Sequence, residues 1–480
     1  MHLKLPSILK GRTVLERDLF NQTVLVPSIN VPNESIQATK WKKSLLNLCS
    51  FKNIRDLQPI SKTHKQVLFD PDIIKTKEDL IEAIPSISKY AEESFDFTSV
   101  DITYANYSIE DVVKAILPDE LGKDRPINTG SGYSLIGHIA HFNLKDEVLP
   151  YKNVIGEFEK PSEKKERKQD LINILAQVVL DKLPAVKTVV NKLHEIDSVY
   201  RNFELEILAG EPNTIVQCRE SKATFQFDFA KVYWNPRLSM FIDSHFLLFI
   251  LFQLGTERER IVGILHHNDL VFDVFAGVGP FVVPALMLGC TVYANDINPE
   301  SVKWMKINLK TNQSKKAPRE YQVHNLDGRE FLRTIALPRI ESYQTEILND
   351  KEKQWCLTEN KIVVLMNLPD IALTFLDVIS EWLTKDIESR QQWLMPIHIY
   401  CYTFSKGENR EEDIRSRLKT ILPNVNEDQI SCRFVRQVAP NKDMLCVRIT
   451  LFDKNPKAIE DERDNRPAKK FKVDPSSTTN

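Results

Sequence analysis

Residues 271–312 read VFDVFAGVGPFVVPALMLGCTVYANDINPESVKWMKINLKTN, and they decide the fold class. An apolar run that ends at Asp273 predicts a short strand, and Gly277 and Gly279 predict a tight turn before the helix that follows. About twenty residues further on, a second apolar strand leads to Asp296. Strands that are apolar along their whole length and alternate with helices are typical of a parallel sheet covered on both faces.

The same alternation of strands and helices extends over residues 255–453. A helix is predicted for TERERIVGIL at 256–265, and further strands are predicted for KIVVLMNLP at 361–369 and IHIYCYTF at 397–404. We therefore expect an α/β fold whose largest domain is a doubly wound, mostly parallel, Rossmann-like sheet.

A small N-terminal α/β module is expected at residues 1–130. The stretch TVLVPSINVP at 23–32 alternates like a strand that proline ends, and KEDLIEAIPSISKYAEESF at 77–95 is typical of short helices. A connector rich in Pro, Gly and Ser, PDELGKDRPINTGSGYS at 118–134, marks the boundary.

A smaller α+β middle domain is expected at residues 131–254. Four strand-like runs, FELEILAG, TIVQCRE, ATFQFDF and KVYW, lie between residues 203 and 234. Two stretches look like insertions: the lysine- and glutamate-rich residues 157–175, expected to be a solvated surface loop or helix, and the apolar residues 239–254. The polar residues 454–480, which contain RPAKKFK, are expected to form a disordered tail.

The composition is that of an ordinary globular protein, with 42% hydrophobic and 27% charged residues. The length of 480 residues predicts two or three domains. The net charge of −2 provides no global basic signature, so a nucleic-acid partner would need a local basic surface. None of the seven cysteines forms a C-x-x-C pair, so neither a metal site nor a disulfide framework is expected, and a reducing compartment fits best.

The stretch 271–312 also has the pattern of a cofactor site. Glycines in the first βα turn let a ligand approach the backbone, and Asp296 after the second strand can accept hydrogen bonds from both ribose hydroxyls. The spacing is G-x-G without the third glycine of the dinucleotide fingerprint, which favours S-adenosylmethionine over NAD. Asp327 follows a third strand-like segment, where it can bind an adenine amino group. The same features occur in doubly wound sheets that bind no cofactor, so a structural role stays open at this point.

Asn367-Leu368-Pro369 ends a fourth predicted strand. Ligands of open α/β sheets bind at the carboxyl ends of the strands, so this tripeptide is interpreted as the substrate face of a methyltransferase. The alternative is ordinary turn chemistry. The Asn-Pro-Pro-aromatic motif that accompanies methylation of exocyclic amines is absent.

Several longer motifs carry a resemblance to a known family. The chain resembles the archaeal and eukaryotic tRNA guanine-37 N1-methyltransferases over nearly its whole length, apart from the tail and the two insert-like stretches. The motifs are GRTVLERDLFNQTVLVPSINVP, GHIAHFNLKDEVLPYKNVIG, YRNFELEILAGEP, VYWNPRL, TERERIV, DVFAGVGPF, YANDINPESVKWMKINLK, NLP and VRQVAPNKDMLCVRI.

The resemblance implies a reaction and a set of catalytic residues. Guanine N1 holds a proton and is a poor nucleophile, so its methylation needs a base and stabilisation of the charge that moves onto O6. By motif, Glu257 is the implied base, and Arg237 and Arg201 lie near the guanine and its phosphates. Tyr233 helps to hold substrate or cofactor, and Asn367 faces the base. Without the resemblance, Glu257 would be interpreted as an ordinary charge of a first helical turn and Arg201 as a surface residue.

The resemblance also implies S-adenosylmethionine as cofactor and a tRNA with guanosine at position 37 as substrate. The implied cofactor contacts are Asp273, Phe275, Gly277, Gly279, Asp296, Asp327, Gly328 and Asn367. Two alternatives remain: a wybutosine-pathway transferase of the same fold, which moves the aminocarboxypropyl arm of the same cofactor, and a catalytically inactive tRNA-binding relative.

The apolar residues 239–254 interrupt the implied active site. In the family a glutamate follows the Arg-Leu pair after two residues, whereas Glu257 stands twenty positions after Arg237. The surplus is sixteen residues long, and its apolar run at 246–254 is about half the roughly 20 apolar residues that a membrane span needs. Its Phe, Leu and Ile codons are T-rich, so we interpret it as a retained in-frame intron. The competing interpretation is a genuine insertion that loops out and exposes apolar surface.

The implied partner is a whole tRNA, whose target base must leave its stack to be reached. We expect a monomer with no membrane association. We expect it in the cytoplasm and nucleus, since KKFK in the tail resembles a weak nuclear signal. The first fifteen residues lack acids and carry Lys4, Lys10 and Arg12, which leaves the mitochondrial matrix open as well.

Overall fold

The computed structural model describes residues 9, 14–37, 54–116, 133–142, 161–195, 203–220, 222–234, 257–349, 360–385, 390 and 392–453. The chain divides into two compact units, Met1–Cys218 with Gln226–Ile242, and Arg219–Phe225 with Asp243–Asn480. The predictions for residues 239–254 and for the tail at 454–480 lie outside the described residues.

The first unit begins with a four-stranded antiparallel sheet in the order β2-β3-β1-β4. The strands are β1 (Gln22–Pro32), β2 (Leu57–Pro59), β3 (His64–Leu68) and β4 (Asp96–Ile102), and the helices are α1 (Asn33–Gln37), α3 (Lys77–Ala83), α4 (Ser88–Ser94) and α5 (Ile109–Ile116). Side chains of β1 point alternately to the two faces of the sheet and pack in two separate cores. Val26 packs in a cluster with residues of α5, whereas Ile29 and Val31 pack in a cluster with residues of α3 and α4. The predicted strand and short helices of this module are confirmed.

A second sheet in this unit has the order β5-β6-β7-β8. Its strands are β5 (Tyr133–Ile136), β6 (Ile139–Phe142), β7 (Thr188–Glu195) and β8 (Phe203–Gly210). β6 and β7 are parallel, and α6 (Pro161–Lys182) connects them. The stretch 157–175, expected to be a solvated insertion, therefore contributes to a crossover helix. Ile172 and Ile174 are buried, so the end of this stretch belongs to the core rather than to a surface insertion.

A two-stranded hairpin of β9 (Ile215–Glu220) and β10 (Ala223–Asp228) follows. The predicted strand KVYW at 231–234 is wrong. The backbone N–H groups of Lys231 and Val232 both donate to the carbonyl of Asp228, at 3.0 and 3.2 Å, so the chain turns instead of continuing the strand. Val232 and Trp234 are buried while Tyr233 is exposed, so the alternating pattern is real but belongs to a turn.

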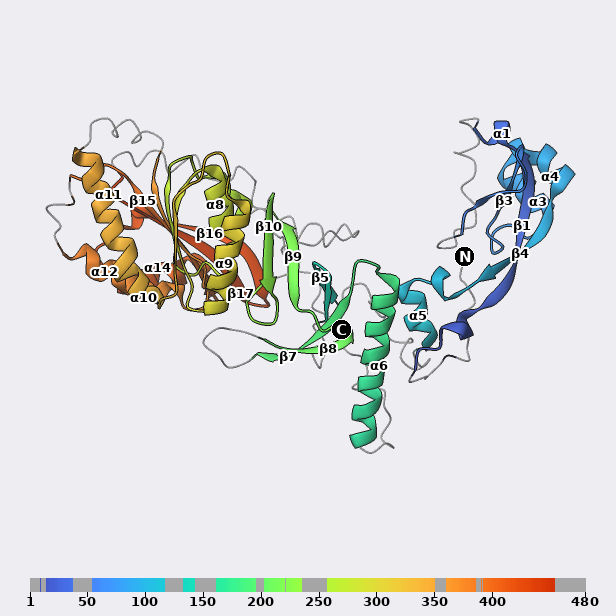
Figure 1. Cartoon of the computed structure of the whole chain (residues 1–480), viewed down its shortest axis with the longest axis horizontal. Helices are drawn as coiled ribbons and strands as arrows, with labels where there is room; N and C mark the ends of the chain where they lie inside the picture. The colour runs from blue at the N-terminus through green and yellow to red at the C-terminus, as the bar shows by residue number, and fades with distance from the viewer. Residues whose placement is uncertain are drawn as a thin grey trace, which may run out of the picture. The chain divides into compact units, whose positions relative to one another are not determined.

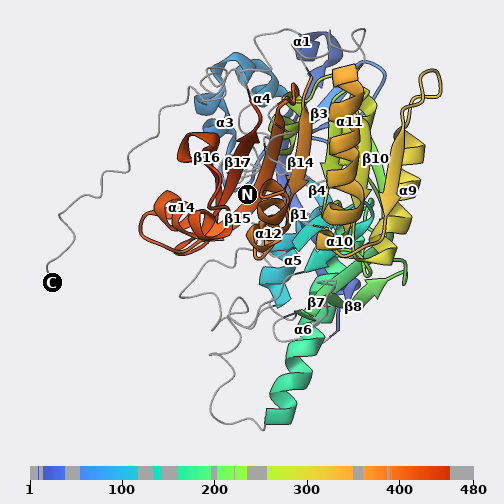
Figure 2. The same ribbon diagram turned by 90° about the vertical axis from the view of Figure 1, so that its left-hand side faces the viewer.

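The second unit contains a seven-stranded sheet in the order β13-β12-β11-β14-β15-β17-β16. The strands are β11 (Leu270–Asp273), β12 (Thr291–Asn295), β13 (Tyr321–His324), β14 (Ile362–Met366), β15 (Ile397–Ser405), β16 (Ile430–Ala439) and β17 (Lys442–Leu451). The first five are parallel, and the β16–β17 hairpin adds two antiparallel strands beside β15, as Figure 2 shows. The predicted doubly wound, mostly parallel sheet is confirmed.

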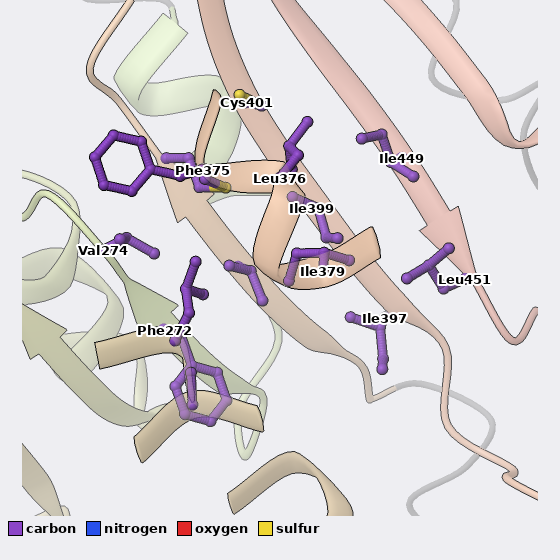
Figure 3. Packing of buried hydrophobic residues seen from close by; sticks show 14 of the residues in the cluster. Phe272, Val274, Phe375, Leu376, Ile379, Ile397, Ile399, Cys401, Ile449 and Leu451 are labelled. Carbon is purple, nitrogen blue, oxygen red and sulfur yellow. The ribbon is translucent and has the colours of Figure 1, made fainter. Parts of the chain in front are cut away.

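Helices cover both faces of this sheet (Figure 1). They are α8 (Val282–Leu288), α9 (Pro299–Asn312), α10 (Gly328–Phe331), α11 (Leu337–Asn349), α12 (Leu376–Leu383) and α14 (Arg410–Ile421). On one face Phe272 of β11 and Val274, which follows this strand, pack with Leu376 and Ile379 of α12 and with the inner side chains of β15 and β17 (Figure 3). Burial from both sides explains why the central strands read as continuous apolar runs.

The tip of the β9–β10 hairpin belongs to the second unit. Glu220 forms an ion pair with Arg258, and both side chains are nearly buried. The backbone of Thr224 donates to the side-chain oxygen of Asn312 at 2.9 Å and accepts from its nitrogen at 2.7 Å. These contacts join the hairpin tip to the helix at 257–263 and to α9.

Candidate cofactor and substrate site

The glycine turn after β11 has the conformation that only glycine adopts without cost. Gly277 and Gly279 have φ values of 57° and 98°. A Cβ at Gly279 would lie 3.0 Å from Val283 of α8, whereas a Cβ at Gly277 would meet nothing within 4 Å. A side chain at Gly279 would therefore press on Val283, whereas Gly277 leaves open space beside the backbone, where a ligand can approach.

Asp296 fastens this turn to the end of β12. One carboxylate oxygen accepts the N–H of Gly277 at 2.8 Å, and the other accepts the N–H of Asn298 at 2.9 Å. Burial raises the pKa of Asp296, and these backbone donors oppose the rise. The Ser301 side chain also hydrogen-bonds to this carboxylate, and since an ionised carboxylate has about four acceptor positions, capacity remains for a ribose hydroxyl.

Asn295 was not predicted as a site residue, and it holds three strand ends together. Its side-chain nitrogen donates to the carbonyl of Val274 at 3.1 Å and to that of Leu326 at 3.0 Å, and its oxygen accepts the N–H of Leu326 at 2.9 Å. Its backbone carbonyl accepts the N–H of Ala276 at 2.8 Å. The sequence shows only an Asn before an Asp, because the partners lie in other segments.

Asp273 is buried at the end of β11 with one oxygen unused. Its first carboxyl oxygen accepts the N–H of Phe275 at 3.2 Å. Its second oxygen is buried and has no hydrogen-bond partner in the described part of the chain. Burial raises the pKa of Asp273 to about 8. A buried, unsatisfied oxygen of this kind fits a ligand that brings its own hydrogen-bond donor.

Gly328 sits between two phenyl rings at the start of α10. A Cβ there would lie 2.9 Å from Phe275 and 2.8 Å from Phe375, whose rings make an edge contact at 4.9 Å between centroids. Asp327 caps this helix, since its carboxylate accepts the N–H of Arg329 at 2.8 Å. The side chain of Asp327 is exposed, and its other oxygen has no partner among the described residues.

Asn367 lies at the carboxyl end of β14. Met366 pairs with Cys401 of β15, so Asn367 and Tyr402 are the next residues on these neighbouring parallel strands. Asn367 is half-buried, and within the described ranges its side chain makes no hydrogen bond. Asn367 is thus open to a ligand, in contrast to Asn295.

Glu257 lies at the same edge of the sheet. It lies in the helix described at 257–263 and is only 6% exposed. The hydroxyl of Tyr402 donates to Glu257 Oε1 at 3.0 Å, Arg260 donates to both oxygens at 2.9 and 3.1 Å, and Arg433 of β16 forms an ion pair with Oε2. The neighbouring Arg258 lies 5.9 Å from the ring of Phe281, which stands two residues after Gly279. The implied base and the implied cofactor turn are therefore brought together.

A basic and aromatic hollow of about 380 Å³ opens beside the Asn367 segment. Its lining residues are Asp370, Phe404, Lys406, Gly407, Asp413, Arg417 and Lys442. Lys442, which belongs to the APNKDM motif, lies 4.1 Å from the centre of the Phe404 ring and 3.5 Å from Asp370.

The remaining predicted residues are not part of this cluster as described. Tyr233 is 52% exposed and belongs to the first unit. Arg201 and Arg237 lie outside the described residues. In the described ranges no group of His, Cys, Asp and Glu is suited to hold a metal, and no helix there is long and apolar enough to cross a membrane.

Comparison with known proteins places this chain in a family. A family model described as the TRM5/TYW2 methyltransferase domain matches residues 214–336, and one described as the TYW2 N-terminal domain matches residues 159–214. The tRNA (guanine(37)-N(1))-methyltransferase of Xenopus tropicalis is 38% identical over 92% of this chain and 79% of its own length. The chain belongs to the tRNA (guanine(37)-N(1))-methyltransferase family.

A second relative and a solved structure are also similar to this chain over most of its length. The Drosophila melanogaster tRNA (guanine(37)-N(1))-methyltransferase is 36% identical over 94% of this chain and 87% of its own length. Among solved structures, aTrm5 in its complex with tRNALeu aligns with a TM-score of 0.53 and 20% identity, over 89% of this chain and 100% of that one. That likeness supports the fold of the family.

Proposed function

We propose that this protein transfers a methyl group from S-adenosylmethionine to N1 of guanosine 37 in tRNA. The observation that carries the proposal is the convergence of Glu257, Asn367 and the glycine turn at one edge of the sheet, in a chain of this family. Ligands of open α/β sheets bind at this edge.

The residues at the edge fit S-adenosylmethionine, which supplies a methyl group on a positively charged sulfur. Asp296 would accept the ribose hydroxyls, and Asp327 would accept the adenine amino group. The turn at Gly277 and Gly279, with Phe275 and Gly328, would let the cofactor lie against backbone and ring. The unpartnered oxygen of Asp273 would accept a hydrogen bond from the cofactor's ammonium group.

Glu257 would act as the base. Two guanidinium groups beside its carboxylate stabilise the ionised form, which is the form that accepts a proton. Guanine N1 would form a bond to the methyl carbon while the carbon–sulfur bond breaks, and the N1 proton would pass to Glu257. Asn367 would hydrogen-bond to the guanine edge, and Arg237 and Arg201 would stabilise the charge that moves onto O6 and the phosphates. Tyr233 would help to hold the substrate.

The test is nucleoside analysis of tRNA after reaction with purified protein and S-adenosylmethionine. A transcript with guanosine at position 37 should gain 1-methylguanosine, and a matched transcript with adenosine there should not. Glu257→Gln should slow the reaction about 100- to 10,000-fold, the usual range for loss of a general base. A product heavier by an aminocarboxypropyl group would instead support the alternative transferase, and an unaffected Glu257→Gln variant would refute the assignment of the base.

The partner and the compartment follow from the same proposal. A complete tRNA is the proposed substrate, and the protein is proposed to act as a monomer, which light scattering with and without tRNA checks. Cytoplasm and nucleus are the proposed compartments, with the mitochondrial matrix as a further one. Imaging of tagged full-length protein, with and without residues 454–480, tests the contribution of the KKFK segment.

A further inference from the structure

The carboxylate of Glu257 is enclosed by three side chains that come from three parts of the chain. Oε1 accepts from Tyr402 and Arg260, and Oε2 accepts from Arg260 and pairs with Arg433. These four interactions fill the about four acceptor positions of a carboxylate. A base that is to take a proton from guanine N1 needs one of those positions, so one partner must give way.

The register of the sheet decides which partners stay. Tyr402 of β15 is paired with Cys446 of β17, and Cys446 is paired with Arg433 of β16. Side chains directly opposite each other on neighbouring strands lie on the same face of a sheet. Tyr402, Cys446 and Arg433 therefore form one row across three strands, and Glu257 bonds to both ends of that row.

The three partners differ in exposure and in their place in the fold. Tyr402 is 1% exposed and lies inside the sheet, and the side chain of Arg260 is 25% exposed. Arg260 also donates to the sulfur of Cys446 at 3.7 Å and lies 5.7 Å from the centre of the Tyr400 ring. Arg433 is 34% exposed and stands on β16, the edge strand. Arg433 has the most exposed side chain of the three and is the only one of them on the edge strand, so we infer that it is the partner that moves away.

We propose that Tyr402 is a positioning residue. Its hydroxyl donates to Glu257 Oε1 and holds the carboxylate in place, so that Oε2 faces the substrate after Arg433 has moved away from it. Tyr402 can serve as a permanent donor because burial raises its pKa well above the ordinary value of a tyrosine. This inference rests on the proposed function of Glu257 as the base. The sequence motif around Glu257 does not contain Tyr402, which lies 145 positions further along the chain.

The decisive experiment measures single-turnover methylation of the guanosine-37 transcript against pH, with KM values for tRNA and cofactor. The charged and titratable groups around Glu257 are Arg258 and Arg260 on its own helix, Glu220, Tyr402, Arg433 and Cys446. Tyr402→Phe should lower the rate about 10- to 100-fold, as expected for one hydrogen bond to a charged group. Both KM values should change less than about threefold. The acidic limb of the profile should move to higher pH, because the lost donor favoured the ionised carboxylate.

Tyr293→Phe is the matched control. Tyr293 is another buried tyrosine of the same sheet, and its hydroxyl accepts from Arg339 at 3.2 Å, away from Glu257. Its acidic limb should coincide with that of the wild type, and melting temperatures of both variants report any loss of folding. An unmoved acidic limb in Tyr402→Phe would overturn the positioning role, even if the rate falls.

Two further variants separate the steps of the inference. Arg433→Met should lower the rate less than Arg260→Met does, since Arg433 is the partner that leaves. A loss in Arg433→Met as deep as in Glu257→Gln would overturn its displacement. If Glu257→Gln remains active, the assignment of the base fails. If Glu257→Gln is inactive but Tyr402→Phe keeps the wild-type acidic limb, as Tyr293→Phe does, only the positioning inference fails.

Discussion

The side chain of Asn295 forms two hydrogen bonds with the backbone of Leu326, donating to its carbonyl at 3.0 Å and accepting from its N–H at 2.9 Å. A single amide thereby ties the end of β12 to the loop after β13. Asp296, the proposed ribose contact, follows Asn295 in the chain, and Asp327, the proposed adenine contact, follows Leu326. The geometry of the cofactor site consequently depends on a residue that touches neither proposed contact atom.

Asn295→Ala should weaken cofactor binding and lower stability together. The substitution leaves buried carbonyl and N–H groups unsatisfied, which costs about 1–3 kcal/mol for each group. Isothermal titration with S-adenosylmethionine and denaturant unfolding measure both effects. Asn325→Ala is the control, because that exposed amide also donates twice, to the carbonyls of Asp296 and Ile297. Equal losses in the two variants would contradict the special role of the buried amide.

Gly328→Ala should destabilise the chain by about 1–3 kcal/mol, the usual cost of overpacking. The added methyl group would lie 2.8 Å from Phe375 and 2.9 Å from Phe275, so the ring pair must move apart. Affinity for S-adenosylmethionine should fall with it. Gly263→Ala serves as the comparison, since a Cβ there meets nothing within 4 Å, and a neutral effect or a slight gain in stability is expected. Chemical denaturation of both variants measures these changes in the free energy of unfolding.

Asp273 should make the stability of the folded chain depend on pH. Its pKa is raised to about 8 by burial, against 3.8 for an ordinary aspartate. The folded chain then binds more protons than the unfolded chain between these values. The contribution of Asp273 is thus fully present below about pH 4 and is lost as the pH rises towards 8, with a limiting slope of about 1.4 kcal/mol per pH unit.

Urea unfolding at several pH values tests this dependence. Asp273→Asn should flatten the curve between about pH 5 and 8, the window that follows from the two pKa values. Asp377→Asn, which removes an exposed carboxylate paired with Arg329, should leave the slope as it is. A slope that persists in Asp273→Asn would assign the pH dependence to other groups.

Lys442→Ala should raise the KM for tRNA and reduce its salt dependence. Lys442 belongs to the basic and aromatic hollow beside Asn367, where an RNA phosphate can bind. Loss of one phosphate contact lowers the slope of log affinity against log salt by about 1. Filter binding at several salt concentrations measures that slope. Lys385→Ala, which removes a lysine paired with Glu381 on α12, is the control with an unchanged slope. Identical slopes for the two variants would place the tRNA elsewhere.

A protein that lacks residues 239–254 should be active, since Arg237 and Glu257 then stand four positions apart. If the segment is a translated intron, sequenced transcripts will lack it, and the shortened protein will be at least about tenfold faster than the full chain. Transcripts that all retain the segment, together with equal activity of the two proteins, would establish a genuine insertion.

The sequence predicted the large sheet well because its signals are local. A strand covered on both faces is a short apolar run, and a βα turn at positive φ requires glycine, so Gly277, Gly279 and the alternation around them are readable in one stretch. The same reasoning failed at KVYW, where alternating burial arises in a turn held by Asp228. It also missed that residues 172 and 174 of the charged stretch point into the core. Periodicity reports burial, and it does not say which hydrogen bonds the backbone makes.

Short-range patterns in the chain were enough to predict the fold class, the glycine turn and the acidic and amide residues at the strand ends, because each depends on neighbours a few positions away. The surroundings of Glu257 emerged only from the folded sheet. Tyr402 and Arg433 lie 145 and 176 positions beyond it, and they meet it because β15, β17 and β16 pair in a register that aligns Tyr402, Cys446 and Arg433. Hydrogen-bond register between distant strands is a property of the folded sheet, and no local pattern in the chain encodes which side chains it places around a buried carboxylate.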